Sequence, residues 1–174
     1  MRDSRKQIYR IALLGLCTAV ALILAYVESL IPPIYAAIPG IKLGLPNIAI
    51  IFVLYGFGWP SAALVSVVRV VAVSLLFSNP MILWYSLSGA ALSLAGMAFL
   101  KHLKIFSVVG VSVAGGVLHN VGQILTAMIL LGTAELGYYL IVLAITGMIS
   151  GVFVGLCGGF AVKRIPVKKL SKNC

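Results

Sequence analysis

Long runs of apolar residues, interrupted by short charged or turn-forming stretches, decide what this chain can fold into. Hydrophobic residues make up 62% of the 174 positions, and the mean hydropathy is +1.17. A soluble domain of this length could not bury so much apolar surface in one core. The chain is therefore expected to use the lipid bilayer as its solvent and to fold as an all-α integral membrane bundle.

Six segments are long and apolar enough, or nearly so, to cross a bilayer as helices, which takes about 20 residues. They are expected at residues 11–31, 43–58, 60–77, 81–100, 107–131 and 137–162, and the second is the shortest. Proline, glycine and asparagine turns separate them, as in the Gly58-Trp59-Pro60 sequence. No soluble stretch stands apart, so residues 1–174 are predicted to form a single transmembrane domain.

The distribution of positive charge predicts the orientation of this bundle. Eleven of the thirteen Lys and Arg residues fall in three clusters, at positions 2–10, 101–104 and 163–172. Cytoplasmic loops of membrane proteins carry the excess of Lys and Arg, and an even number of crossings puts all three clusters on one side. Both termini are therefore predicted to be cytoplasmic, in a multi-pass protein of the cell membrane. The net charge of +10 then reflects topology and contact with anionic lipid, with no nucleic-acid partner.

Lys42 and Arg69 are the two cations that topology does not explain. Arg69 lies in the middle of a span, where an unpaired charge costs at least ~3 kcal/mol, so it must face the bundle interior, a partner or a water-filled cavity. Further polar side chains fall in the outer half of the bundle: Glu28, Asn47, His119, Asn120 and Gln123. This pattern predicts a pocket that opens outward beneath an apolar loop at residues 32–42. The alternative is a structural network, such as Glu28 with Lys42 or Arg69, that binds nothing.

Small residues at a spacing of four form two further helix faces. Gly147, Gly151, Gly155 and Gly159 share one face of the last segment, where close packing inside the bundle is the favoured interpretation. Gly15 and Ala19 share a face of the first segment. For that face, packing within the chain and docking of a partner helix are about equally well supported.

The chain has too few acidic residues for a magnesium-dependent enzyme that acts on diphosphates. Only Asp3, Glu28 and Glu135 occur, so no acidic cluster can hold magnesium on a diphosphate, and there is no GxxxxGK[ST] loop for ATP. The three cysteines form no disulfide or metal-ligand pattern. We therefore expect a protein that is not an enzyme and has no cofactor or metal. Any ATP-driven step would belong to another chain.

Several motifs resemble the Gx transporter family, which is often labelled heptaprenyl diphosphate synthase component I. They are the PGIKLGLPN sequence at 39–47, the helix of Arg69, YSLSG at 85–89, and VGVS at 109–112 leading to HNVGQ at 119–123. The resemblance covers residues 8–162. This family is in turn similar to the substrate-binding S components of energy-coupling factor (ECF) transporters. The resemblance implies a six-helix subunit that captures a small molecule outside and works with a transmembrane T component and two cytoplasmic ATPases.

Roles for the polar residues follow from the residues and this resemblance together. Lys42 and Arg69 would neutralise an anionic group on a vitamin-, quinone- or isoprenoid-type ligand. Glu28 would orient one of these cations or meet a cationic part of the ligand. Directional hydrogen bonds would come from Asn47, His119, Asn120 and Gln123.

The resemblance also implies a place for the partner subunit. Gly15 and Ala19 would dock the T component, with Gly15 standing where S components usually have alanine. Two hypotheses from other classes stay open. One is a non-catalytic membrane subunit of a prenyl diphosphate synthase, and the other is a small standalone carrier.

Overall fold

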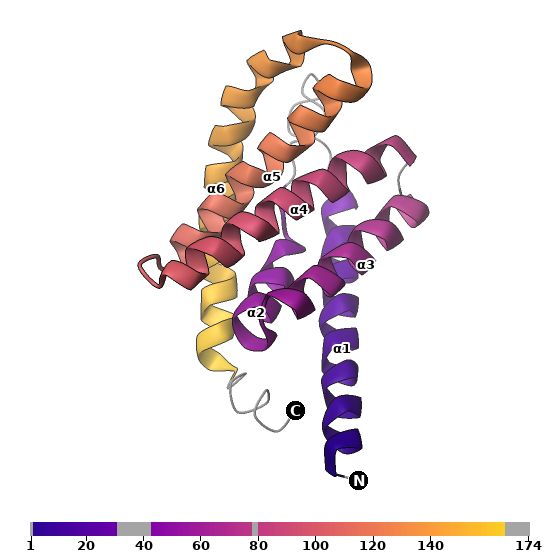
Figure 1. Cartoon of the computed structure of the whole chain (residues 1–174), viewed down its shortest axis with the longest axis vertical. Coiled ribbons are helices and arrows are strands. Elements are labelled where there is room, and N and C mark those ends of the chain that lie inside the picture. The colour runs from indigo at the N-terminus through magenta and orange to yellow at the C-terminus, as the bar shows by residue number, and fades with distance from the viewer. Residues whose placement is uncertain (1, 31–42, 78–79, 166–174) are drawn as a thin grey trace.

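The computed structural model describes residues 2–30, 43–77 and 80–165, and these ranges are helical almost throughout (Figure 1). They form the α-helices α1 (Arg2–Leu30), α2 (Asn47–Phe57), α3 (Trp59–Phe77), α4 (Pro80–Leu103), α5 (Val108–Leu131) and α6 (Tyr139–Arg164), with the 3-10 helix η1 (Ala134–Tyr138) before α6. The predicted all-α class is confirmed. The apolar loop predicted at residues 32–42, Lys42 included, lies outside the described residues.

Five of these helices, α1, α3, α4, α5 and α6, are long and apolar enough to cross a membrane, as expected for a multi-pass membrane protein. The helix α2 has only 11 residues, and at 1.5 Å per residue it reaches about 16 Å, roughly half of a hydrocarbon core. The segment predicted at 43–58 is thus a helix, but one too short to span a bilayer by itself. Six crossings and cytoplasmic termini stay predictions.

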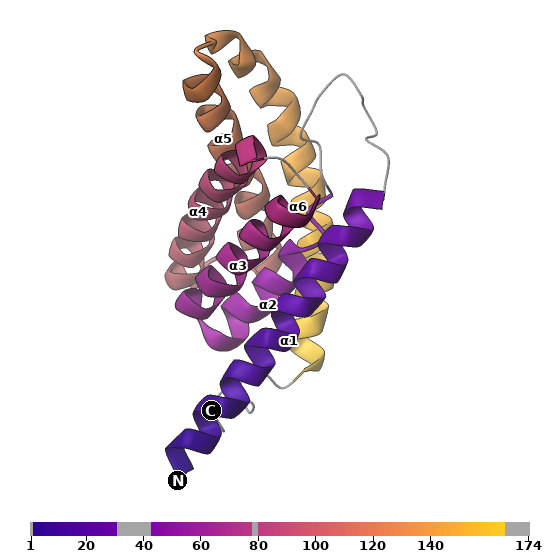
Figure 2. The same ribbon diagram turned by 90° about the vertical axis from the view of Figure 1, so that its right-hand side faces the viewer.

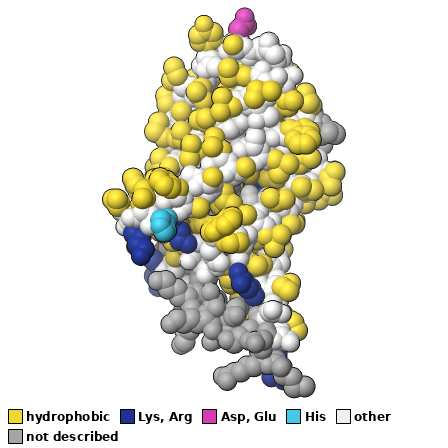
Figure 3. All heavy atoms as spheres, viewed as in Figure 1, with side chains coloured by type: hydrophobic (Ala, Val, Ile, Leu, Met, Phe, Trp, Pro, Cys, Tyr) yellow, Lys and Arg dark blue, Asp and Glu magenta, His cyan; other side chains and the backbone are white. Residues whose placement is uncertain are grey.

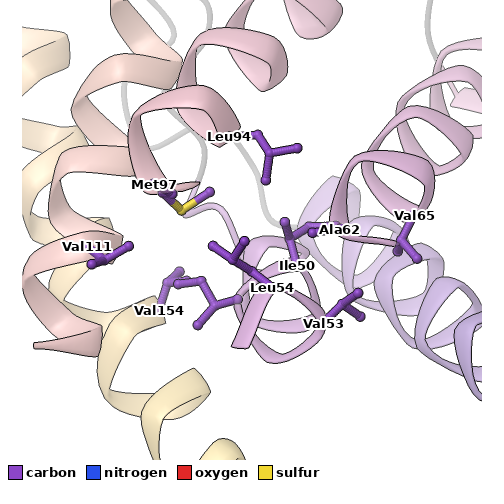
Figure 4. Close-up of a cluster of buried hydrophobic side chains, with 10 residues drawn as sticks. Ile50, Val53, Leu54, Ala62, Val65, Leu94, Met97, Val111 and Val154 are labelled. Carbon is purple, nitrogen blue, oxygen red and sulfur yellow. The ribbon is translucent and has the colours of Figure 1, made fainter. Parts of the chain in front are cut away.

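The short helix α2 lies in the centre of the bundle. The helices α5 and α6 form a hairpin with α4 packed on α5, while α1 lies on the opposite side against α3 (Figures 1 and 2). The α2 side chains Ile50, Val53 and Leu54 are at most 2% exposed. Around them lie apolar side chains from α3, α4, α5 and α6 (Figure 4). Because α2 is surrounded by apolar residues, it can be hydrophobic on all sides.

Glycines bring the backbones of α4, α5 and α6 into direct contact. A Cβ atom on Gly151 would lie 2.6 Å from the Cα of Val113, and one on Gly122 would lie 2.9 Å from the Cα of Gly89. The same holds for Gly147 and Gly155, which meet the backbone or side chains of α5. Such close approach is typical of helix pairs in lipid, where packing replaces the hydrophobic effect. The predicted internal role of this α6 face is confirmed for Gly147, Gly151 and Gly155.

Basic side chains gather toward one end of the molecule. In the space-filling view, the Lys and Arg side chains lie in the lower part, and an acidic side chain lies at the opposite end (Figure 3). Apart from Arg69 in α3, the basic residues of the described ranges lie in the first half of α1, at or just after the end of α4, and in the last turn of α6. This segregation is the arrangement that the positive-inside rule requires.

Candidate functional site

Glu28 joins the end of α1 to the turn that precedes α2. Its carboxylate Oε1 accepts a hydrogen bond from the Gly44 backbone N–H over 2.6 Å. Gly44 has φ +71°, a left-handed conformation that glycine adopts freely. A Cβ there would lie 3.4 Å from Asn47 Nδ2 and 3.9 Å from Val154 Cγ2. Since Val154 belongs to the middle of α6, the start of α2 and Asn47 lie deeper in the bundle than the sequence suggests.

Arg69, in the middle of α3, brings a cation to this region. Its Nε atom is buried and makes no hydrogen bond within the described part of the chain. The Glu28 carboxylate is close enough to act electrostatically on the Arg69 guanidinium. A buried donor without an acceptor costs about 1–3 kcal/mol, and more when it is charged. The structure thus gathers Glu28, Asn47 and Arg69 around the turn before α2, and the Nε donor of Arg69 has no acceptor among the residues that the structure describes.

His119 and Gln123 lie at a different seam, between α5 and α4. A Cβ on Gly89 would lie 2.7 Å from the carbonyl oxygen of His119, 2.8 Å from Gln123 Cγ and 3.1 Å from His119 Cε1. Beside them, the Ser88 hydroxyl donates a hydrogen bond to the Gly122 carbonyl over 3.1 Å. Two of the motifs that carry the family resemblance, at 85–89 and 119–123, therefore pack on each other. A ligand-binding role for His119 and Gln123 stays a prediction.

Asn120 turns to the other side of α5, toward α6. Its Nδ2 donates a hydrogen bond to the Leu143 carbonyl over 2.5 Å, and the same carbonyl accepts the Thr146 hydroxyl over 3.0 Å. The amide side chain therefore joins α5 to α6. Asn120 follows His119 in the sequence but lies at a different helix seam. The sequence predicted the two residues in one polar cluster.

Two cations that the sequence assigns to topology alone make specific contacts. Lys101 Nζ donates to the Leu54 carbonyl over 2.5 Å and lies 5.0 Å above the centre of the Tyr55 ring. Since Leu54 lies in the last turn of α2, the cation stabilises the negative end of that helix. Arg10 Nη2 donates to Ser61 Oγ over 2.9 Å, which ties α1 to the start of α3. The two residues of each pair are 47 and 51 positions apart in the sequence. No spacing pattern in the sequence predicts contacts over such separations.

Small residues of α1 lie on two different faces of the helix. Ala21 and Ala25 are buried against the bundle. Gly15 and Ala19 are exposed, and no described atom comes within 4 Å of the place that a Cβ on Gly15 would take. The chain thus packs α1 through the Ala21–Ala25 face and leaves the Gly15–Ala19 face uncovered.

The long apolar helices and the cluster of Glu28, Asn47 and Arg69 define the class of the protein: a small helical membrane protein with polar residues at a central half-length helix. Across residues 2–30, 43–77 and 80–165, no three His, Cys, Asp or Glu side chains come together as metal ligands would. The model of the heptaprenyl diphosphate synthase component I family matches residues 17–161, and the chain belongs to that family. The resemblance seen in the motifs is thereby confirmed. No curated protein and no solved structure gave a match.

Proposed function

We propose that this chain is the substrate-binding membrane subunit of an ECF-type importer. The observation that carries the proposal is Arg69, a mid-span arginine whose buried Nε has no acceptor among the described residues. Ionisable groups inside membrane spans are costly and are kept mainly where they serve a function. An anionic ligand would supply the missing acceptor. Glu28 and Asn47, which lie around the same turn, would orient the cation and add a hydrogen bond.

The ligand in this proposal is a small anionic molecule of the vitamin, quinone or isoprenoid kind. Lys42, which lies five residues before α2 begins at Asn47, would be a second cation for it. His119 and Gln123 would contact it from the α4–α5 seam. Asn120 has its Nδ2 engaged with Leu143, so it would act by holding α5 and α6 in place.

The uncovered face of α1 supports assembly with a partner helix. Gly15 and Ala19 present a flat, exposed surface, and small residues of this kind let two helix backbones approach closely in lipid. A T component would dock on this face. Two cytoplasmic ATPases would supply the energy, because the chain itself has no ATP-binding loop.

Native mass spectrometry of the gently purified protein tests this function. We expect a bound small molecule in the wild-type protein and its loss in Arg69→Ala. The control is Arg164→Ala, which removes an exposed cation from the end of α6 and should keep the ligand. In the cell, ATPase subunits should co-purify with the wild-type chain. A protein that carries no small molecule and co-purifies with no ATPase would refute the proposal.

A second candidate is a non-catalytic membrane subunit of a prenyl diphosphate synthase, and the family description favours it. In that case the basic end of the bundle would face a soluble synthase. Co-purification separates the two functions, because this candidate predicts a soluble prenyl-transferring enzyme in place of ATPases. The standalone carrier predicts uptake by the purified chain alone in lipid vesicles.

A further inference from the structure

The Glu28 carboxylate lies at a place in the bundle that is suited to an anion. It accepts the Gly44 N–H over 2.6 Å in the turn before α2, and it acts on the Arg69 guanidinium. The N-terminus of a helix carries a partial positive charge of about half a unit. The start of α2 lies inside the bundle, because a Cβ on Gly44 would lie 3.9 Å from Val154 Cγ2 and Pro46 is fully buried. Half-length helices that begin inside a membrane bundle are where transporters bind anionic groups.

A second observation shows that this place has unused binding capacity. A guanidinium group has five N–H donors in a fixed geometry, and the Arg69 Nε donor is buried with no acceptor in the described ranges. The Glu28 side chain is half-buried and lies two residues from the end of α1. Because the side chain is partly exposed and near the helix end, a change of its rotamer would be enough to move the carboxylate away from Gly44.

We propose that Glu28 is a built-in substitute for the ligand, and that an oxyanion of the ligand, a carboxylate or phosphate group, displaces the Glu28 carboxylate from Gly44 and Arg69. The empty site then keeps its buried arginine compensated, which an unoccupied cationic site in a membrane would not. Binding exchanges one anion for another. An uncharged analogue of the same shape cannot make this exchange, so the site selects for charge. This inference rests on the proposed function and names the chemical class that its site accepts.

Chemical rescue of a Glu28 variant tests the proposal with small anions as probes. Glu28→Ala removes the internal carboxylate and leaves a vacancy that fits acetate. In the detergent-solubilised full-length chain, we expect Tm to fall by roughly 4 °C or more. Sodium acetate or inorganic phosphate should restore it, because a ligand that binds the folded state raises stability. Sodium chloride at matched ionic strength should not. Rescue by acetate alone identifies a carboxylate site, and rescue by phosphate alone identifies a phosphate site.

Three further variants make the test decisive. Adding Arg69→Gln to Glu28→Ala should abolish the rescue, since the guanidinium forms half of the site. Glu135→Ala removes an exposed acid from η1 and should be neither destabilised nor rescued. If Glu28→Ala does not fold, Glu28→Asp, whose carboxylate falls one methylene short of Gly44, should show the same rescue with a smaller shift.

The outcomes separate this inference from the proposed function. The oxyanion site would be overturned if neither acetate nor phosphate restored the Tm of Glu28→Ala. Equal rescue with and without Arg69 would overturn it too. Loss of the native ligand in Arg69→Ala would still support the importer subunit in that case. Rescue in a protein that carries no native ligand and no ATPase partner would instead keep the oxyanion site and remove the importer role.

Discussion

Different kinds of contact hold the helices together within the two halves of the bundle, α4 to α6 and α1 to α3. In α4, α5 and α6, glycines put backbone against backbone, as where Gly151 meets Val113. The helices α1, α2 and α3 also pack through apolar side chains, and charged side chains add connections between them, as where Glu28 of α1 accepts the Gly44 N–H in the turn before α2. A ligand cannot replace a contact between two packed backbones, whereas a ligand can replace one partner of a polar contact. The comparison suggests a rigid scaffold beside a half that can respond to binding.

The two halves meet at α2. On one side Gly158 of α6 packs against Ile51, whose Cγ2 would lie 3.0 Å from a Cβ on the glycine. From the same half, Lys101 of α4 donates a hydrogen bond to the Leu54 carbonyl in the last turn of α2. One end of α2 is therefore fixed to the scaffold, while the opposite end, at Gly44, is bound to Glu28 of α1.

The largest effect is expected where a side chain is added to the scaffold. In Gly151→Leu the new Cβ would lie 2.6 Å from Val113 Cα and 2.9 Å from the Ser112 carbonyl oxygen, so α5 and α6 must separate. We expect a loss of about 3 kcal/mol or more, seen as a lower yield of monodisperse protein and a lower Tm. Gly15→Leu is the matched control, because its Cβ meets nothing within 4 Å. Equal destabilisation by both variants would contradict the contrast between the halves.

A smaller loss of stability is expected where α4 holds α2. Lys101→Met removes the hydrogen bond to Leu54 and the contact with the Tyr55 ring, which together contribute about 1–3 kcal/mol. Thermal unfolding should show this loss in Lys101→Met. It should be absent in Lys104→Met, where the cation is exposed. A similar Tm for the two variants would show that Lys101 serves topology alone.

Substitutions on the uncovered face of α1 should change assembly without changing stability. Gly15→Leu or Ala19→Leu is expected to weaken co-purification of a partner helix, because the added side chain keeps the two backbones apart. Ligand binding should stay near that of the wild-type protein. Ala91→Leu provides a control at an exposed alanine on α4. Loss of ligand binding with an intact complex would show that the α1 face is internal.

The smallest effect on the protein is expected in a test of its orientation, which needs only single cysteine substitutions. In a background without Cys17, Cys157 and Cys174, an impermeant thiol reagent should label Ala134→Cys from outside intact cells. It should not label Ile105→Cys, which lies beside the Lys101–Lys104 cluster. Both positions are exposed, so accessibility does not separate them. The reverse pattern would invert the predicted topology.

Local features of the sequence predicted most of the fold. Apolar runs and turn residues set the order of the helices, and the glycine spacing in α6 identified its packing face. The length of α2 was overestimated, because residues 43–46 are apolar enough to extend a span. Pro46 and the left-handed Gly44 instead form a turn, and the helix begins at Asn47.

The candidate site was predicted in part. Glu28, Asn47 and Arg69 come together, as the cost of a mid-span arginine suggests. His119 and Gln123 lie at the seam of α5 with α4 and Asn120 at the seam with α6, because α5 is packed on two sides and its periodicity cannot show which neighbour a residue meets. Their ligand-binding roles stay predictions. The contacts of Lys101 and Arg10 depend on how distant helices pack, which a single sequence does not reveal.

The central claim, that Arg69 binds a ligand, is tested most directly by Arg69→Ala, Glu28→Gln and the double variant, with Tm and affinity for the co-purified ligand measured for each. The account predicts that Arg69→Ala folds with a Tm within about 4 °C of wild type. Its affinity should fall by roughly one to two orders of magnitude, as loss of a charge-assisted contact worth ~1.5–3 kcal/mol implies. A sharp fall in Tm for Arg69→Ala that Glu28→Gln reverses, with affinity unchanged in every variant that folds, would contradict it and make the pair a structural strut.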